Sequence, residues 1–158
     1  MISEYYDCCE TEFGLLYIHF KDTNLTALTF QQPKDMRFSS TSTSSALCNE
    51  LCEYFSLKRK TFTAALSFEG ATDFQKTVWT CVINVPYGET RTYKWLAQKI
   101  RRPCAYRAVG HALGLNPIPV IVPCHRVIRS NNTLGGYSGG IEVKKRLLEL
   151  EIKGNKFF

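Results

Sequence analysis

Hydrophobic and polar positions alternate over residues 5–30 in the way that half-buried strands require. The segments "YYDCC" at 5–9, "GLLYIHF" at 14–20 and "LTALTF" at 25–30 are rich in aromatic and aliphatic residues, and "KDTN" at 21–24 has the composition of a hairpin connection. The pattern predicts a small antiparallel sheet.

A helix is expected to follow this sheet. The stretch "SSTSTSS" at 39–45 has too little apolar content to pack and predicts a loop. In "ALCNELCEYF" at 46–55 the large apolar side chains recur at helical spacing, which predicts a helix that covers one face of the sheet. Residues 56–72 are interpreted as the passage to a second domain.

From residue 73 onward the hydrophobic period is that of helices. Apolar residues at 74, 78, 81, 82 and 85 predict a helix that Asp73 caps and that "PYGE" ends. A second helix is expected from about Thr92, and a third through "AYRAVGHALG" to Gly114, because glycine is a typical helix stop. Two short helices rich in basic and small residues have the outline of a helix-turn-helix.

The last helix is predicted over "IEVKKRLLELE" at 141–151. The basic run 144–146 is expected to lie mainly toward solvent, and the apolar side is marked by Val143, Leu147, Leu148 and Leu150. Glu151 shares the face of Leu147 and Leu148. A carboxylate on an apolar face needs a partner or a route to water, so Glu151 belongs either to a site or to a fraying helix end.

The chain of 158 residues therefore divides into two predicted domains. Residues 1–70 form a sheet and helix domain with a structural role, and residues 71–158 form a mainly helical domain that contains the helix-turn-helix. The fold class is α/β, of the α+β kind. With 44% hydrophobic and 22% charged residues, the composition is that of a globular protein.

The sequence also bears on location. No apolar run approaches the length of a membrane span, and the start "MISEYYDCCE" carries acids and lacks the features of a secretion signal. We expect an intracellular protein, in the cytoplasm or the nucleus, that has no membrane partner.

Charge is distributed unevenly between the two predicted domains. Residues 1–70 hold six Lys and Arg against nine Asp and Glu, a net charge of −3, whereas residues 71–158 hold fourteen against five, a net charge of +9. A positive field confined to one domain favours a polyanionic partner such as nucleic acid, and the alternative is a solubilising surface.

The seven cysteines point to an intracellular setting, because an odd number cannot pair completely and no C-x-x-C motif is present. Cys8 and Cys9 are adjacent, and Cys48 and Cys52 are four residues apart on the predicted helix. We expect small buried thiols rather than metal ligands, and no metal.

The stretch "VIVPCHRVIRS" at 120–130 contains the candidate nucleophile, Cys124. A proline that can start a turn precedes it, and His125 and Arg126 follow it. The amides of a helical first turn and the charge of Arg126 would favour a thiolate. An activated cysteine also needs a base and an acid that orients the base, and His125 and Glu151 supply those residue types.

Four blocks of the sequence together resemble one family. "YGETRTYKWLA" at 87–97, "RAVGHALGLNPIPVIVPCHR" at 107–126, "PCHRVI" at 123–128 and "GGYSGGIEVKKRLLELE" at 135–151 are similar, in this order, to the O6-alkylguanine-DNA alkyltransferases. The resemblance covers most of the second predicted domain, and the first domain matches only in outline.

The resemblance implies a role for each matching catalytic residue. Cys124 is the alkyl acceptor, His125 is its base acting through a water, and Glu151 completes the hydrogen-bonded chain. Tyr93 donates a hydrogen bond to the guanine ring, and Asn116 ties the DNA-reading helix to the active-site loop. Arg107 is the finger that fills the space left by an extruded nucleotide.

The resemblance also implies two sets of surrounding residues. Expected DNA contacts, in addition to Arg107 and Tyr93, are Lys94, Arg102, Ala105, Ala108, Gly110 and Ser130. Expected pocket residues are Leu113, Pro119, Val127, Gly135, Tyr137, Ser138 and Gly139. Tyr106 and His111 are bulkier than is usual on the reading helix, and Cys104, beside the DNA surface, is expected to be partly buried.

The implied activity is DNA repair by direct reversal. A monomer would flip O6-alkylguanine, mainly O6-methylguanine and also O4-methylthymine, from duplex DNA through the minor groove. It would move the alkyl group irreversibly to Cys124 in a single turnover, without a cofactor. Two alternatives stay open: a cysteine hydrolase that uses the same three residues, and a non-catalytic alkyltransferase-like binder of damaged DNA.

Overall fold

The computed structural model describes residues 3–34 and 37–156. Contacts within the chain divide it into two compact units, Met1–Glu69 and Gly70–Phe158, called here the N-terminal and C-terminal units. The residues predicted to carry the chemistry all lie in the C-terminal unit.

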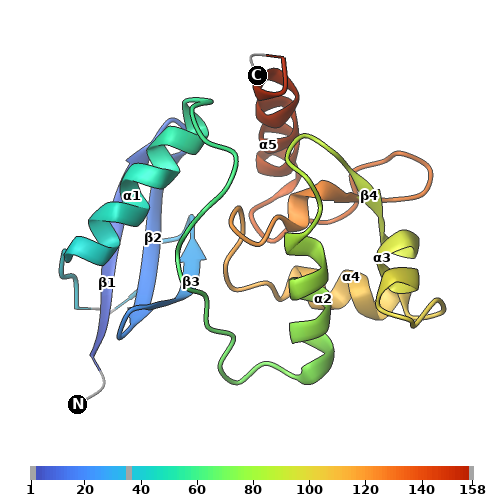
Figure 1. Cartoon of the computed structure of the whole chain (residues 1–158), viewed down its shortest axis with the longest axis horizontal. Coiled ribbons are helices and arrows are strands. Elements are labelled where there is room, and N and C mark those ends of the chain that lie inside the picture. The colour runs from blue at the N-terminus through green and yellow to red at the C-terminus, as the bar shows by residue number, and fades with distance from the viewer. Residues whose placement is uncertain (1–2, 35–36, 157–158) are drawn as a thin grey trace. The chain divides into compact units, whose positions relative to one another are not determined.

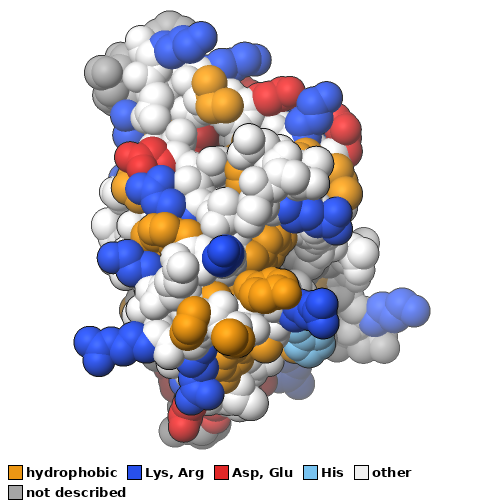
Figure 2. Space-filling view, turned by 90° about the vertical axis from the view of Figure 1, so that its right-hand side faces the viewer, with side chains coloured by type: hydrophobic (Ala, Val, Ile, Leu, Met, Phe, Trp, Pro, Cys, Tyr) orange, Lys and Arg blue, Asp and Glu red, His pale blue; other side chains and the backbone are white. Residues whose placement is uncertain are grey.

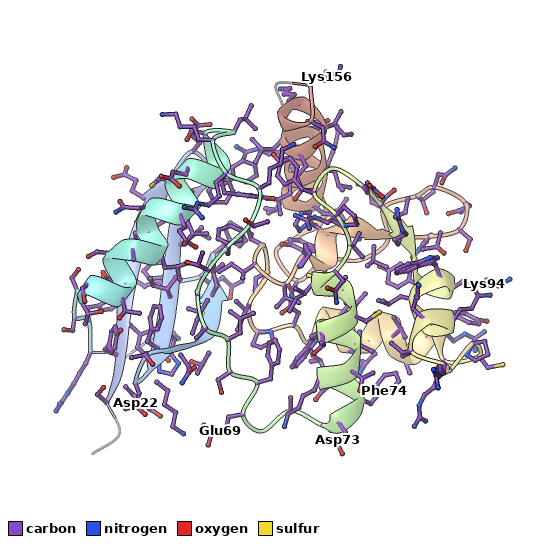
Figure 3. All side chains as sticks on the ribbon, viewed as in Figure 1. Asp22, Glu69, Asp73, Phe74, Lys94 and Lys156 are labelled. Atoms are coloured by element: carbon purple, nitrogen blue, oxygen red, sulfur yellow. A yellow bond between two sulfur atoms is a disulfide. The ribbon has the colours of Figure 1, made fainter. Side chains whose placement is uncertain are left out.

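The N-terminal unit is built on the predicted antiparallel sheet. Its strands are β1 (Glu4–Thr11), β2 (Gly14–Lys21) and β3 (Asn24–Thr29), in the order β1-β2-β3 (Figure 1). The predicted hairpin connection is confirmed, since Asp22 lies with φ +54° in the turn between β2 and β3 (Figure 3). Alternate residues of β2 are buried, as the sequence pattern requires.

Helix α1 (Ser42–Phe55) lies across one face of the sheet (Figure 1) and buries Leu47, Leu51, Tyr54 and Phe55. It begins earlier than expected, because part of the serine and threonine stretch is helical. Thr41 accepts a hydrogen bond from the Ser44 backbone N–H, and the Ser44 hydroxyl accepts one from the Thr41 N–H. This reciprocal cap provides hydrogen-bond partners for backbone N–H groups at the start of the helix, and the apolar pattern of the sequence does not reveal it.

The expectation of small buried thiols is wrong for most of the N-terminal cysteines. Cys9 and Cys48 form a disulfide that joins β1 to α1, while Cys8 and Cys52 are exposed. Adjacent residues of a strand face opposite sides of a sheet, so only Cys9 of the pair at 8 and 9 can face the helix. Cys104 in the C-terminal unit is also exposed rather than partly buried.

The C-terminal unit contains the predicted helices α2 (Asp73–Ile83), α3 (Tyr93–Lys99) and α4 (Tyr106–Gly114) (Figure 1). Asp73 is the first residue of α2 (Figure 3) rather than its cap, which is Thr72. The Trp79 indole N–H donates to the carbonyl of Ala112 at 2.8 Å, so α2 is tied to the buried side of α4.

The chain between α4 and α5 returns to the helices and forms a second, smaller sheet. A 3₁₀ turn at Cys124–Arg126 leads directly into β5 (Val127–Ile128), which pairs in parallel with β4 (Arg91–Thr92), just before α3. The sequence pattern did not predict this two-residue pairing, because strands this short have no period.

Helix α5 (Ile141–Gly154) presents a buried stripe that is half polar. Its buried residues are Lys144, Leu147, Glu151 and Gly154. Lys144 is therefore buried and not directed to solvent, and Val143, Leu148 and Leu150 are only partly buried. The expected apolar side was correct at Leu147 but missed Lys144, whose Nζ donates to the carbonyls of Val127 and Gly136.

The predicted mixed α/β fold is confirmed, with a small antiparallel sheet and five α-helices among the described residues. Within residues 3–34 and 37–156, each helix is too short or too polar to cross a lipid bilayer. The same residues contain no group of three or more Cys, His, Asp or Glu side chains that could hold a metal ion.

Candidate active site

A pocket of about 900 Å³ opens between α3, α4 and the segment 129–138. Its walls contain nine of the residues predicted from the sequence: Tyr93, Lys94, Arg107, Gly110, Leu113, Cys124, Ser130, Tyr137 and Ser138. The walls also include four residues that were not predicted as site residues: Tyr106, Gly114, Arg129 and Gly136. Cys124 therefore lines a space large enough for a ligand.

The loop after α4 fixes Cys124 in this pocket. The side-chain nitrogen of Asn116 donates to the carbonyl of Val122 at 2.9 Å and lies 3.1 Å from the Cys124 sulfur, and its oxygen accepts from the Ile118 N–H at 2.9 Å. The loop contains Val120 with φ +75°, a strained conformation for a β-branched residue. Asn116 thus holds a strained loop in place and contacts the sulfur of Cys124.

Cys124 is 5% exposed, and this burial dominates its ionisation. Burial raises the pKa of the Cys124 thiol to about 11, while the Asn116 amide, the charge of Lys144 and the backbone N–H groups of Cys124 and His125 act to lower it. The site therefore surrounds the sulfur with donors that favour the thiolate, but a base must remove the proton.

His125 and Glu151 form a fully buried pair behind the cysteine. Nε2 of His125 lies 2.8 Å from Oε1 of Glu151. Because a carboxylate only accepts hydrogen bonds, Nε2 carries the hydrogen and Nδ1 is the basic atom. Nδ1 is buried and has no hydrogen-bond partner among the described residues. Burial lowers the pKa of His125, so the ring is neutral and can accept a proton.

Arg126 is the second partner of Glu151. Its Nε and Nη2 donate to the Glu151 carboxylate at 2.9–3.2 Å, and its Nη1 donates to the carbonyl of Val85 at 2.7 Å. The Gly88 N–H donates to Oε2 of Glu151 at 2.9 Å. The sequence suggested that Arg126 favours the thiolate of Cys124. In the structure the guanidinium of Arg126 instead donates hydrogen bonds to Glu151.

Two hydrogen-bonding partners, His125 and Arg126, decide the ionisation of Glu151. Burial acts to raise the pKa of Glu151, but the hydrogen bond with His125 and the hydrogen bonds and charge of Arg126 outweigh it and hold the pKa well below its usual range. Glu151 is therefore a partnered carboxylate inside the C-terminal unit and not part of a fraying helix end.

Lys144 is a site residue that the sequence did not reveal. Its Nζ donates to the carbonyls of Val127 at 2.6 Å and Gly136 at 3.2 Å, and lies 5.9 Å from the centre of the Tyr93 ring. Burial lowers its pKa to about 8, against the attraction of Cys124. The spacing of the sequence could have indicated this, because Lys144 lies seven residues before Glu151 and therefore on the same face of the helix.

Tyr93 and Tyr137 line the same pocket as Cys124. Burial, followed by the neighbouring Cys124, raises the pKa of both phenols, so both are hydrogen-bond donors at neutral pH. Gly135 has φ +71°, and a β-carbon there would lie 2.7 Å from the Tyr93 hydroxyl. Gly135 thus allows the segment 134–138 to approach Tyr93.

Five of the eight residues expected to contact DNA line the pocket: Tyr93, Lys94, Arg107, Gly110 and Ser130. Lys94 projects outward from α3 (Figure 3), and Arg102, Arg107, Ala108 and Ser130 are also exposed. The Arg107 guanidinium lies 5.9 Å from the centre of the Tyr106 ring. On the side of the molecule where α3 lies, Lys and Arg side chains surround a central group of hydrophobic ones (Figure 2).

Other predicted residues lie outside the pocket walls. His125, Glu151 and Asn116 are buried behind Cys124, and Pro119 and Val127 are buried in the loop and β5. The remaining predicted residues outside the walls are Arg102, Ala105, Ala108, Gly135 and Gly139. Val127 bears on the site through its backbone, because its carbonyl accepts from Lys144.

The C-terminal unit matches a known class of domain. The family model described as "6-O-methylguanine DNA methyltransferase, DNA binding domain" matches residues 73–153, from α2 almost to the end of α5. The C-terminal unit is therefore a DNA-binding domain of the class found in 6-O-methylguanine DNA methyltransferases.

Relatives and solved structures agree with this match. The chain is 38% identical over 157 residues to the constitutive methylated-DNA-protein-cysteine methyltransferase of Bacillus subtilis, covering 93% of this chain and 94% of that one. It is 53% identical over 103 residues to the Methanosarcina mazei protein of the same name, where the match spans only 65% of each chain. The chain belongs to the methylated-DNA-protein-cysteine methyltransferase family.

The solved structures extend the similarity to both units. The Mycobacterium tuberculosis OGT in complex with DNA superposes with a TM-score of 0.87 at 39% identity and covers 95% of this chain and 94% of that chain. The O6-methylguanine-DNA methyltransferase of Pyrococcus kodakaraensis KOD1 gives a TM-score of 0.67 at 27% identity and covers 94% and 99%.

Proposed function

We propose that this protein repairs DNA by direct reversal and transfers the alkyl group of O6-alkylguanine, mainly O6-methylguanine and also O4-methylthymine, to Cys124. The observation that carries the proposal is a buried cysteine facing a pocket of about 900 Å³, with a neutral, carboxylate-bound histidine next to it in the chain. Two relatives are named methylated-DNA-protein-cysteine methyltransferases, and the proposal follows this naming.

The first step is activation of the thiol. Nδ1 of His125 takes the proton of Cys124 through a bridging water, and Glu151 stabilises the imidazolium that forms. Asn116, at 3.1 Å from the sulfur, and the charge of Lys144 stabilise the thiolate. These groups are already in place before substrate binds, so little reorganisation opposes the reaction.

The second step is displacement at the alkyl carbon. A bond forms between the Cys124 sulfur and the carbon, and the bond from that carbon to O6 breaks. The electron pair of the broken bond stays on guanine, which takes up a proton and leaves neutral; this proton balances the one that His125 removed from Cys124. Tyr93, a donor at neutral pH, would hydrogen-bond the guanine ring as this charge develops.

Access to the pocket requires the nucleotide to leave the duplex, which costs a few kcal/mol. Arg107, at the pocket mouth, would fill the space in the base stack, and α4 would lie in the minor groove. Ala105, Ala108 and Gly110 permit close approach there, while Lys94, Arg102 and Ser130 would contact phosphates. The net charge of +9 over residues 71–158 supports a nucleic-acid partner.

A thioether has no easy leaving reaction, so each molecule would act once. We propose an intracellular monomer that needs no cofactor. Pocket walls for the guanine would come from Leu113, Tyr137 and Ser138, with Pro119, Val127, Gly135 and Gly139 supporting them from behind.

One experiment tests this function. The protein is incubated with an excess of duplex DNA bearing O6-methylguanine, and the intact protein and its peptides are weighed. We expect one methyl group per molecule, located on Cys124, and none on a Cys124→Ser variant. Repeated turnover would favour a cysteine hydrolase instead, and binding of the damaged duplex without methyl transfer would favour an alkyltransferase-like binder.

Arg107→Ala is expected to slow repair of the duplex much more than reaction with free O6-benzylguanine. The reason is that a free base needs no extrusion, so the finger has nothing to replace. Single-turnover rates on both substrates measure the ratio, and Arg146→Ala, an exposed arginine of α5, is the charge control. Equal losses of rate on the two substrates would contradict the role of Arg107 as the finger.

A further inference from the structure

The buried carboxylate of Glu151 is shared between two side chains that follow one another in the chain. Oε1 of Glu151 lies 2.8 Å from Nε2 of His125 and accepts from Nη2 of Arg126 at 2.9 Å. The Arg126 guanidinium also donates through Nε to both carboxylate oxygens. The carboxylate of Glu151 therefore accepts hydrogen bonds from both the His125 ring and the Arg126 guanidinium.

Arg126 is itself held rigidly. It is 6% exposed, its Nη1 donates to the carbonyl of Val85, and its guanidinium lies 5.7 Å from the centre of the Tyr87 ring. Val85 and Tyr87 lie just after α2, and the Gly88 N–H donates to Oε2 of Glu151. The segment 85–88 and Arg126 thus fix both oxygens of the carboxylate.

We propose that Arg126 is a positioning residue for the transfer reaction: its guanidinium fixes Glu151 and, through Glu151, holds the neutral ring of His125 with Nδ1 available as the base. This inference rests on the proposed function. Without Arg126 the carboxylate would keep the Gly88 N–H but lose the donors that hold Oε1 beside the ring, and its unbalanced charge would favour a protonated ring that cannot accept the thiol proton.

The charged and titratable groups around His125 support this assignment. Glu151 favours the imidazolium, whereas Arg126 and Lys144 oppose it. Cys124 precedes the ring, and Tyr137 meets it edge-on with centroids 6.5 Å apart. Arg126 is the cation that shares an acceptor oxygen with the ring, so it has the most direct control over the pair.

Two variants separate the charge of Arg126 from its geometry. Arg126→Gln removes the charge. Arg126→Lys keeps the charge but cannot donate two parallel hydrogen bonds to the carboxylate of Glu151. Arg146→Gln, exposed on α5, is the control. For each variant we would measure the single-turnover rate of methyl transfer against pH, the protonation of His125 by NMR of its ring nitrogens, and the folded fraction.

We expect the Gln variant to transfer at least about tenfold more slowly at neutral pH, and both its rate profile and its His125 protonation to move to higher pH. The Lys variant should keep the wild-type protonation pH and have an intermediate rate. If the Gln variant does not fold, the transfer rate and the His125 protonation of the Lys variant decide the test.

Two results would overturn the inference. One is wild-type transfer by the folded variants. The other is an unchanged His125 protonation together with a rate loss that only follows the unfolded fraction, which would make Arg126 merely structural. The wild-type arm separates the two proposals, because a wild-type protein that leaves Cys124 unmethylated contradicts the proposed function itself.

Discussion

Glu151→Gln is expected to lower the rate of methyl transfer by at least about a hundredfold and to destabilise the protein by about 3 to 5 kcal/mol. Glutamine has the same shape, but its neutral amide cannot balance the buried guanidinium of Arg126 or stabilise an imidazolium at His125. It also presents N–H groups to the donors of Arg126 and Gly88. Single-turnover assays and denaturant unfolding measure the two losses.

The stability loss has a defined pH dependence. The pKa of Glu151 is lower in the folded protein than in the unfolded chain, so its contribution is present above the unfolded value of about 4.3 and is lost as the pH falls further. The difference between wild type and Glu151→Gln should therefore be largest near neutral pH and shrink below about pH 4.3.

Glu149→Gln on the same helix is the matched control, because Glu149 is exposed and outside the site. It should leave both the rate and the stability within the error of wild type. A Glu151→Gln protein that is as stable as this control, or that transfers methyl groups as fast, would contradict the buried three-residue arrangement of His125, Arg126 and Glu151.

Lys144→Met is expected to slow methyl transfer at least about tenfold and to destabilise the protein by about 1 to 3 kcal/mol. The variant leaves the carbonyls of Val127 and Gly136 without their donor and removes a positive charge that favours the Cys124 thiolate. Methionine fills a similar volume, so the loss is mainly electrostatic and polar rather than steric.

The pKa of Lys144 gives this prediction a second readout. Because burial lowers that pKa to about 8, the wild-type ammonium is charged below this pH and neutral above it. The rate ratio of wild type to Lys144→Met should therefore be largest below pH 8 and fall above it. Lys145→Met, the exposed neighbour, controls for surface charge, and a ratio near one at every pH would show that Lys144 has no part in activation.

The sequence determined most of the secondary structure, because the periods of strands and helices are local. The three strands, the hairpin at residues 21–24 and the helices after residue 72 were predicted from those periods and are confirmed. The start of α1 was placed too late, since the cap of Thr41 and Ser44 depends on polar groups that carry no hydrophobic period.

The sequence alone also singled out Cys124 as a candidate and Glu151 as a carboxylate that needs a partner. It did not decide which polar groups meet, because the partners are far apart in the chain. Glu151 is 26 residues from His125 and 63 from Gly88. From the sequence, Lys144 was expected to face solvent and Arg126 to act on Cys124, but the fold buries both, and a buried charge needs a defined partner. The tertiary structure therefore decided that Arg126 and Lys144 lie inside the protein, where Arg126 pairs with Glu151 and Lys144 donates to the carbonyls of Val127 and Gly136.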